Sequence, residues 1–265
     1  MDDFLDRWPP VEGVRRSTAV IGGRACHRYV GEGQLPRGRL LYVHGGGFIF
    51  GSASRYSASV GRLAAEARVE AWVCDYRLSP EHRFPAALED IERTLDHLLG
   101  AEHGLPVVMA GDSAGGGLAV AAVVRRAARG LTLPRALALF SPLLDLSASA
   151  PSYKEHAGTD VMLSAETVEL IARTYARGDV TNPEASPLVS RSFSGFPPTA
   201  LYASTDEVLR DDSVTFTARL SDDGVPVRLH LEPGAPHVWT VFGDALPPAR
   251  ATLEDAASFL ASYLA

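Results

Sequence analysis

The sequence has only two cysteines and no apolar run long enough to span a membrane. Cys26 and Cys74 are too few for the disulfide framework of a small secreted domain, and Cys74 stands in an apolar stretch, where we expect an unreactive core residue. No uninterrupted apolar run reaches the ~18 residues of a membrane span. The acidic start, Met1–Asp6, lacks the basic and then apolar layout of a signal peptide. These absences favour a cytoplasmic protein without a membrane span.

Positive charge is also scarce. The chain has 25 Lys and Arg against 32 Asp and Glu, which gives a formal net charge of −7. The basic residues are scattered, whereas binding to nucleic-acid phosphates needs clustered Lys and Arg. Zinc-ligand spacing, the Lys-Ser/Thr of a phosphate-binding loop and a dinucleotide fingerprint are all missing. We therefore expect no nucleic-acid partner, no metal and no cofactor.

Repeats and low-complexity tracts are absent too, and the 265 residues read as one domain, 1–265, with alternating strands and helices. Two strands joined by Gly22-Gly23 predict an opening hairpin. The rest predicts a mostly parallel central sheet flanked by helices, an α/β architecture. Residues 146–190 break the rhythm and predict an inserted lid or pocket segment. The expected strands are 17–21, 25–30, 39–44, 70–76, 106–111, 136–140, 199–204 and 227–232, and the expected helices are 56–67, 86–100, 118–129, 164–177, 212–223 and 248–264.

The stretch from Val107 to Gly116 carries the clearest chemical signal. An apolar strand runs into Gly-x-Ser-x-Gly, and a helix follows. In this context the motif predicts a nucleophile elbow, which holds Ser113 on a strained turn above the amino end of a helix. Gly111 and Gly115 allow the close approach of the flanking chain.

A serine hydroxyl needs a base to take its proton and a third group to orient that base. Functional groups of an open α/β sheet gather at the carboxyl ends of its strands. Asp206 follows the strand 199–204, and His237 follows the strand 227–232. The order Ser113, Asp206, His237 is the one expected of an α/β-hydrolase. Asp211 and Asp212 are the alternative acids, although their place at a helix start favours a role as helix-end charges.

The second chemical element is His44-Gly45-Gly46-Gly47, which directly follows a predicted strand. Acyl transfer passes through an oxyanion, and a glycine-rich loop of this type supplies a backbone N–H to it. Ala114, the residue after the nucleophile, supplies another. His44 itself is interpreted as an organiser of the turn.

Together these motifs resemble the bacterial hormone-sensitive-lipase family. The match runs from about residue 39 to 264 and implies an α/β-hydrolase with the triad Ser113, Asp206, His237 and an oxyanion hole made by Gly46, Gly47 and Ala114. The form around Asp206 is similar to the branch named monoterpene lactone hydrolases. The amino-terminal cap of the family is shortened here to about residues 1–12. The supporting blocks are Asp75–His82, Phe84–Ala87, Asn182–Leu188, Asp206–Ser213 and Pro233–Trp239.

The resulting hypothesis is a metal-free serine hydrolase acting on small to medium acyl esters or lactones. Ile49, Phe50 and Trp239 are expected to line the substrate pocket, with ordinary core packing as the alternative for Ile49. Phe4, Leu5 and Trp8 fit either a short helix over the pocket or a homodimer contact. Amide or carbonate hydrolysis, cyclisation and acyl transfer by the same triad stay open, as does a non-catalytic ligand-binding protein on this scaffold.

Overall fold

The computed structural model of the chain describes residues 10–101 and 104–265, so nearly all of the predicted cap lies outside the described residues. The described chain opens with the predicted hairpin, in which β1 (Val14–Ile21) pairs antiparallel with β2 (Arg24–Gly31). Gly22 and Gly23 form its turn with positive φ angles of 58° and 82°, which glycine adopts without steric cost.

Among the described residues, eight strands form one sheet in the order β1-β2-β4-β3-β5-β6-β7-β8. The pairs that involve β2 are antiparallel, and all the others are parallel. The prediction of a mostly parallel sheet with an antiparallel opening is therefore confirmed. The remaining strands are β3 (Gly38–Val43), β4 (Val69–Cys74), β5 (Val107–Asp112), β6 (Leu137–Phe140), β7 (Thr199–Ser204) and β8 (Val227–Glu232).

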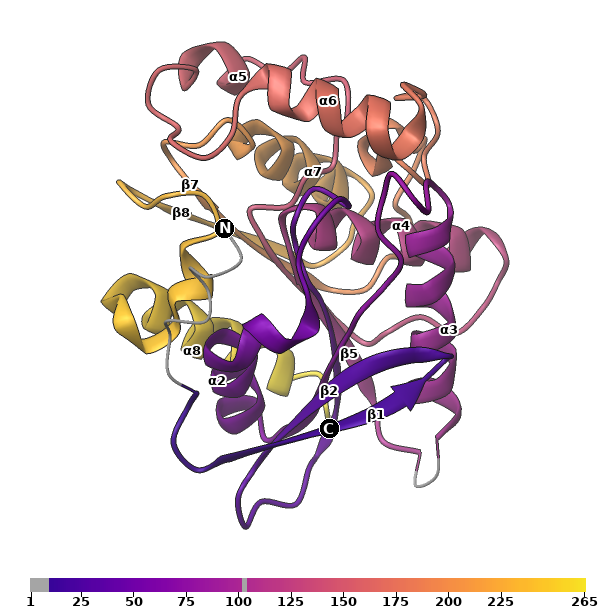
Figure 1. Ribbon diagram of the computed structural model, residues 1–265, viewed down its shortest axis with the longest axis vertical. Coiled ribbons are helices and arrows are strands. Elements are labelled where there is room, and N and C mark those ends of the chain that lie inside the picture. Colours follow the sequence, from indigo (N-terminus) through magenta and orange to yellow (C-terminus); the bar gives the residue numbers. More distant parts are fainter. Residues whose placement is uncertain (1–9, 102–103) are drawn as a thin grey trace.

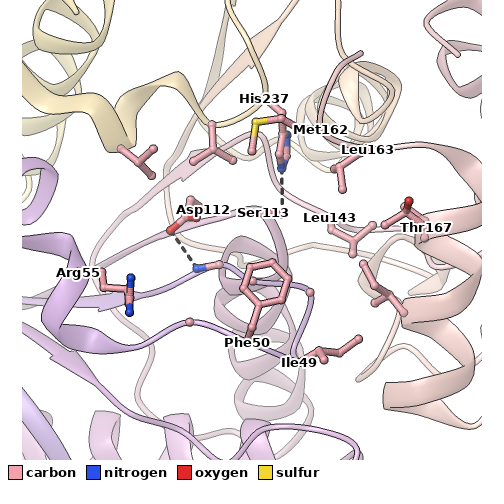
Figure 2. Close-up of a pocket in the computed structure, with 18 of the residues that line it drawn as sticks. Ile49, Phe50, Arg55, Asp112, Ser113, Leu143, Met162, Leu163, Thr167 and His237 are labelled. Carbon is pink, nitrogen blue, oxygen red and sulfur yellow. Dashed lines mark hydrogen bonds between the residues drawn. The ribbon is translucent and has the colours of Figure 1, made fainter. Parts of the chain in front are cut away.

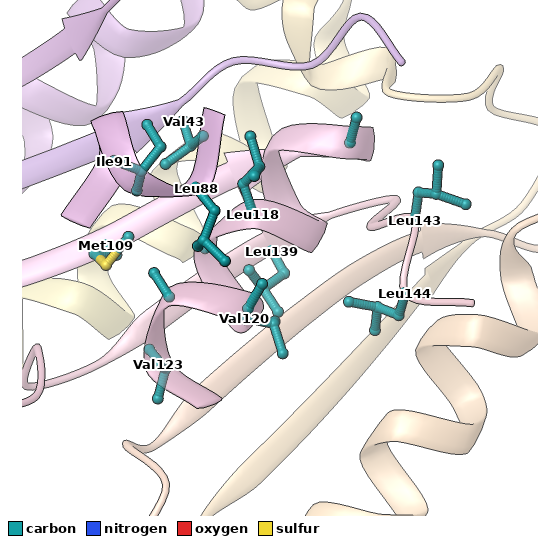
Figure 3. Packing of buried hydrophobic residues seen from close by; sticks show 14 of the residues in the cluster. Val43, Leu88, Ile91, Met109, Leu118, Val120, Val123, Leu139, Leu143 and Leu144 are labelled. Atoms are coloured by element: carbon teal, nitrogen blue, oxygen red, sulfur yellow. The ribbon is translucent and has the colours of Figure 1, made fainter. Parts of the chain in front are cut away.

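Helices cover both faces of this sheet, as Figure 1 shows. Strand β3 illustrates why: Leu40 and Tyr42 join the core on one face, and Leu41 and Val43 join the core on the other. The first core includes α2 (Ser57–Ala67) and α8 (Pro247–Ala261). The second, part of which is drawn in Figure 3, includes α3 (Ala86–Gly100), α4 (Ser113–Ala128) and α7 (Arg210–Asp222).

The segment predicted as an insertion carries its own short helices. They are α5 (Ser152–Glu155), α6 (Ala165–Ala176) and the 3₁₀ turn η2 (Pro187–Val189). Figure 1 shows α5 and α6 at the top of the view, away from α2 and α8. Two further 3₁₀ segments, η1 (Ala53–Tyr56) and η3 (Trp239–Ala245), precede α2 and α8. Within residues 10–101 and 104–265, none of the helices combines the length and apolar character that crossing a bilayer needs.

The structure corrects the interpretation of the cysteines. Cys26 on β2 and Cys74 on β4 are partners in the antiparallel register, and their sulfurs are joined as a disulfide. Both residues are buried, with exposures of 0% and 2%. The sequence pattern could not reveal this pairing, because β3 lies between β2 and β4 in the chain. The cysteine argument for a cytoplasmic location is therefore lost, and that location stays a prediction.

Candidate functional site

Ser113 lies where β5 ends and α4 begins, as the elbow motif predicts. Its backbone adopts φ +49°, a left-handed conformation that L-residues rarely take and that marks a strained functional turn. The turn is tight enough that a Cβ atom on Gly115 would overlap the backbone oxygens of Val43 and His44. Glycine at this position is therefore required by packing, and it lets the serine hydroxyl stand at the end of the sheet.

Two hydrogen bonds link Ser113, His237 and Glu207 in series, with the histidine in the middle. His237 Nε2 lies 3.0 Å from Ser113 Oγ, as drawn in Figure 2, and His237 Nδ1 lies 2.5 Å from Glu207 Oε2. All three side chains are buried or nearly so, with residue exposures of 9%, 5% and 1% for serine, histidine and glutamate. A second oxygen of Glu207 accepts the N–H of Ser204 at 2.7 Å, which fixes the carboxylate. Serine, imidazole and carboxylate therefore lie in the linear arrangement of a hydrolase triad.

Asp206 is not the acid partner of His237, and that prediction is wrong. Its side chain is exposed and accepts hydrogen bonds from Thr205 Oγ1 and from the N–H of Gly234. These bonds hold the pKa of Asp206 below its usual range. The side chains of adjacent residues in this turn point in opposite directions. Asp206 therefore points into solvent, and Glu207 points into the protein interior. Glu207 directly precedes the buried pair Val208-Leu209, a signal in the sequence that could have identified it.

The glycine loop after β3 brings backbone amides to the same place. Gly46 and Gly47 have φ angles of +114° and +60° and line the cavity beside Ser113. In the described part of the chain, their N–H groups donate to no acceptor. Ala114 is buried in the first turn of α4, where helix N–H groups lack intrahelical partners. The three expected oxyanion donors are therefore gathered near the serine. His44 lies behind them, with Nδ1 2.8 Å from the Gly45 oxygen and its ring stacked on Tyr76.

Asp112 holds the glycine loop against the elbow, a role that sequence reasoning missed. Its Oδ1 accepts the Tyr42 hydroxyl at 2.9 Å and the Gly45 N–H at 3.1 Å, and its Oδ2 accepts the Tyr56 hydroxyl at 3.1 Å. Burial raises the pKa of Asp112 to about 6, although these hydrogen bonds and the nearby His237 oppose the rise. Asp112, the residue before the nucleophile, is thus hydrogen-bonded to the loop that carries the amides.

Replacing Asp112 by Asn should change how stability depends on pH. The folded protein holds the Asp112 proton up to about pH 6, whereas an unfolded chain loses it near the ordinary value of 3.8. The contribution of this group to the free energy of unfolding therefore falls as pH rises between these values, by up to about 3 kcal/mol. Urea denaturation of both proteins from about pH 4 to about pH 7 should show that the free energy of unfolding of the wild type falls relative to that of Asp112→Asn as pH rises. A stability difference that is constant with pH would contradict this.

Ser113 and His237 line a cavity of about 380 Å³. One side is formed by Leu143 and by Val168 and Ile171 of α6, so the predicted insertion does supply part of the wall. Figure 2 shows Leu143, Leu163 and Thr167 on one side of the serine and Arg55 on the other. Most of the side chains that line the cavity are apolar, which suits an organic ligand oriented by a few polar groups.

The three predicted pocket residues do not all reach this cavity. Ile49 and Phe50 line it, but Trp239 does not. Trp239 is 0% exposed and packs in the core with α2 and α8, and its Nε1 donates to Thr252 Oγ1 at 3.3 Å. The reason is local: Val238 adopts φ +53° and lines the cavity itself, so the next side chain turns away.

The remaining acids near the site also have specific places. Asp211 and Asp212 stand in the first turn of α7, as expected of helix-end charges. Asp212 is nevertheless buried, at 1% exposure, and accepts two backbone N–H groups. Within the described residues, no cluster of three or more His, Cys, Asp or Glu side chains could hold a metal ion. The expected absence of a cofactor stays a prediction.

Comparison with known proteins places this site in a family. Residues 40–241 match the family described as alpha/beta hydrolase fold. The chain is 33% identical to an acetyl-hydrolase of Streptomyces hygroscopicus over 252 residues, which cover 94% of this chain and 83% of the relative. It is 35% identical to the esterase LipU of Mycobacterium tuberculosis in an alignment 265 residues long that covers 95% of this chain and 88% of the relative.

A solved structure gives the same answer. An esterase from the bacterial hormone-sensitive lipase family superposes with a TM-score of 0.94 at 31% identity, over 100% of this chain and 89% of that one. The resemblance predicted from the sequence motifs is confirmed, while its lactone-hydrolase aspect stays a prediction. The chain is a serine hydrolase of carboxylesterase type and belongs to the hormone-sensitive-lipase-like esterases of the α/β-hydrolase family.

Proposed function

We propose that the protein hydrolyses small to medium carboxylic esters through an acyl-enzyme on Ser113, with His237 as base and Glu207 as the acid of the triad. The observation that carries the proposal is the pair of contacts on one imidazole: Nε2 lies at 3.0 Å from the serine oxygen, and Nδ1 lies against the buried carboxylate. Such a histidine can take and return a proton at the serine without leaving its place.

In the first half of the reaction, Ser113 Oγ attacks the ester carbonyl carbon and its proton moves to His237 Nε2. The carbonyl oxygen becomes an oxyanion, which accepts hydrogen bonds from the N–H groups of Gly46, Gly47 and Ala114. When the carbon–oxygen bond to the alcohol breaks, His237 donates its proton to the departing oxygen. The alcohol leaves, and the acyl group stays on the serine as an ester.

In the second half, water takes the place of the alcohol. His237 removes a proton from water, whose oxygen attacks the acyl carbon and regenerates an oxyanion at the same amides. The bond to Ser113 Oγ then breaks, and His237 returns the proton to the serine. The carboxylic acid is released and the enzyme is restored. Throughout, Glu207 accepts the Nδ1–H of His237, so it selects the tautomer with Nε2 free and stabilises the imidazolium.

The size and lining of the cavity support a compact apolar substrate. A volume of about 380 Å³ is at the lower end of the range for small-molecule sites. The acetyl-hydrolase and esterase names of the relatives point the same way. An intact, correctly aligned triad favours catalysis over a purely ligand-binding role.

A panel of p-nitrophenyl esters of increasing acyl length, together with lactones, tests this proposal. We expect turnover of the short and medium esters that declines once the acyl chain outgrows the cavity. Repeating the assay with alcohols and amines present, and identifying the products by mass spectrometry, separates hydrolysis from acyl transfer. Turnover of no ester or lactone would contradict the proposal, and a dominant transfer product would replace hydrolysis by acyl transfer.

A further inference from the structure

A short loop after β6 connects the nucleophile segment to the histidine segment. Residues 141–145, here called the strap, follow β6 directly. The N–H of Leu143 donates to the backbone oxygen of Ser113 at 3.0 Å, and Ser141 Oγ accepts the N–H of Val238 at 3.2 Å. The strap therefore contacts the backbone of the nucleophile and of the residue after His237.

The strap also forms part of the cavity wall. The Leu143 side chain lines the cavity, and Figure 2 shows it on the same side of Ser113 as Thr167 of α6. Figure 3 shows Leu143 and Leu144 together on this loop. A shift of the strap would thus move a wall of the cavity and, through the Leu143 N–H, a hydrogen bond to the elbow.

Asp212 holds the far end of the strap. Its Oδ2 accepts the N–H of Leu144 at 2.7 Å and that of Asp145 at 2.9 Å. Asp212 belongs to the first turn of α7, which begins three residues after Glu207. One buried carboxyl group therefore links the strap to the helix that follows the acid of the triad.

Only one of the two carboxyl oxygens of Asp212 accepts hydrogen bonds from the strap among the described residues. Its other oxygen, Oδ1, is buried and has no hydrogen-bond partner among the described residues. The titratable groups that interact electrostatically with the Asp212 carboxyl are Tyr153 of α5, Asp145 of the strap and Glu207. Burial raises the pKa of Asp212 to about 8; its two backbone hydrogen bonds oppose the rise, and the charges of Asp145 and Glu207 add to it. The two strap hydrogen bonds need only an acceptor oxygen, so Asp212 can hold the strap as a hydrogen-bond acceptor rather than as a charge.

We propose that Asp212 is a positioning residue that, through the strap, sets the place of Ser113 and of the Leu143 wall and so determines which acyl chains are accepted. This inference rests on the proposed function, because it concerns the same reaction. Asp212 touches no substrate in this account: it acts through the backbone of residues 143–145. An acceptor without charge suffices for the role, so an amide oxygen should replace the carboxyl.

Three variants test the inference on p-nitrophenyl esters of increasing acyl length. Asp212→Ala removes the acceptor, Asp212→Asn keeps one oxygen in the same place, and Asp211→Asn is a matched control on the same turn. Asp211 instead accepts the N–H of Ser152 and pairs with Arg210. Rates are referred to the fraction of enzyme that a phosphonate ester labels, so that misfolded protein does not count.

We expect Asp212→Ala to lose at least about tenfold in kcat/KM on the butyrate ester and to show a flattened dependence on acyl length, because small displacements of reacting groups are costly. Asp212→Asn and Asp211→Asn should stay within about threefold of the wild type and keep its acyl preference. If Asp212→Ala does not fold, Asp212→Asn still decides.

Two results would overturn the inference. One is a folded Asp212→Asn that loses more than about tenfold, which would assign Asp212 a role as a charge. The other is an Asp212→Ala with unchanged rate and acyl preference. Both leave the proposed function standing, since that fails only if the wild type itself turns over no ester.

Discussion

Replacing Glu207 by Gln is expected to lower kcat by about 10⁴-fold while leaving the fold intact. The carboxylate accepts the Nδ1–H of His237 and, through its other oxygen, the N–H of Ser204. An amide can satisfy the N–H of Ser204 with its oxygen, but it then turns its NH₂ group toward Nδ1. That group favours the tautomer with the proton on Nε2, which cannot accept the proton of Ser113. Steady-state kinetics on a short p-nitrophenyl ester measures the loss.

Asp206→Asn is the matched control for this experiment, since it changes the neighbouring acid in the same way. Its carboxylate is exposed and only bridges Thr205 and Gly234, so we expect a change of less than about threefold. The reverse ranking, with Asp206→Asn the more damaging variant, would return the acid role to Asp206 and contradict the assignment of Glu207.

Replacing Ser113 by Ala should remove about 10⁶-fold in kcat, the loss expected when a triad serine is deleted. Without Oγ there is no nucleophile to carry the acyl group, and only the amides and the cavity remain to help water attack. The thermal midpoint should stay close to that of the wild type, because alanine fits the volume and loses only the bond to His237.

Ser59→Ala is a suitable control for Ser113→Ala. Ser59 is a buried serine of α2, its Oγ has no hydrogen-bond partner among the described residues, and it does not line the cavity. We expect full activity from this variant. A Ser113→Ala protein that kept more than a few per cent of wild-type activity, after purification that excludes contaminating esterases, would contradict the acyl-enzyme mechanism.

The sheet and the nucleophile were predictable because strong local signals coincide there. The apolar strand before Gly111 and the small residues after Ser113 specify a strand, a turn and a helix, and little else in the chain competes with that pattern. His237 was predictable for a related reason: it follows the last strand, at the edge of the sheet where functional side chains gather.

The acid and one pocket residue were not predictable from spacing alone, because facing is decided within a single turn. Asp206 and Glu207 are adjacent and both can serve as the acid, yet only Glu207 points inward. Trp239 is adjacent to cavity-lining Val238, yet the left-handed backbone at Val238 directs it into the core. In each case a step of one residue along the chain moves the side chain from solvent or cavity into the protein interior.

Buried polar contacts between distant segments were the least accessible to sequence reasoning. Asp112 binds Gly45, Tyr42 and Tyr56, and Asp212 binds the strap, through contacts that exist only once the sheet has brought these segments together. The disulfide between Cys26 and Cys74 is of the same kind, since it depends on which strands become neighbours.

The most direct test of the account is covalent labelling with a p-nitrophenyl alkylphosphonate, followed by intact-mass measurement and peptide mapping. A triad with an adjacent oxyanion hole should displace nitrophenol and leave one phosphonyl group per chain on Ser113, and Ser113→Ala and His237→Ala should not be labelled on this time scale. A wild-type protein that acquires no adduct, or that acquires it on a residue other than Ser113, would contradict the central claim.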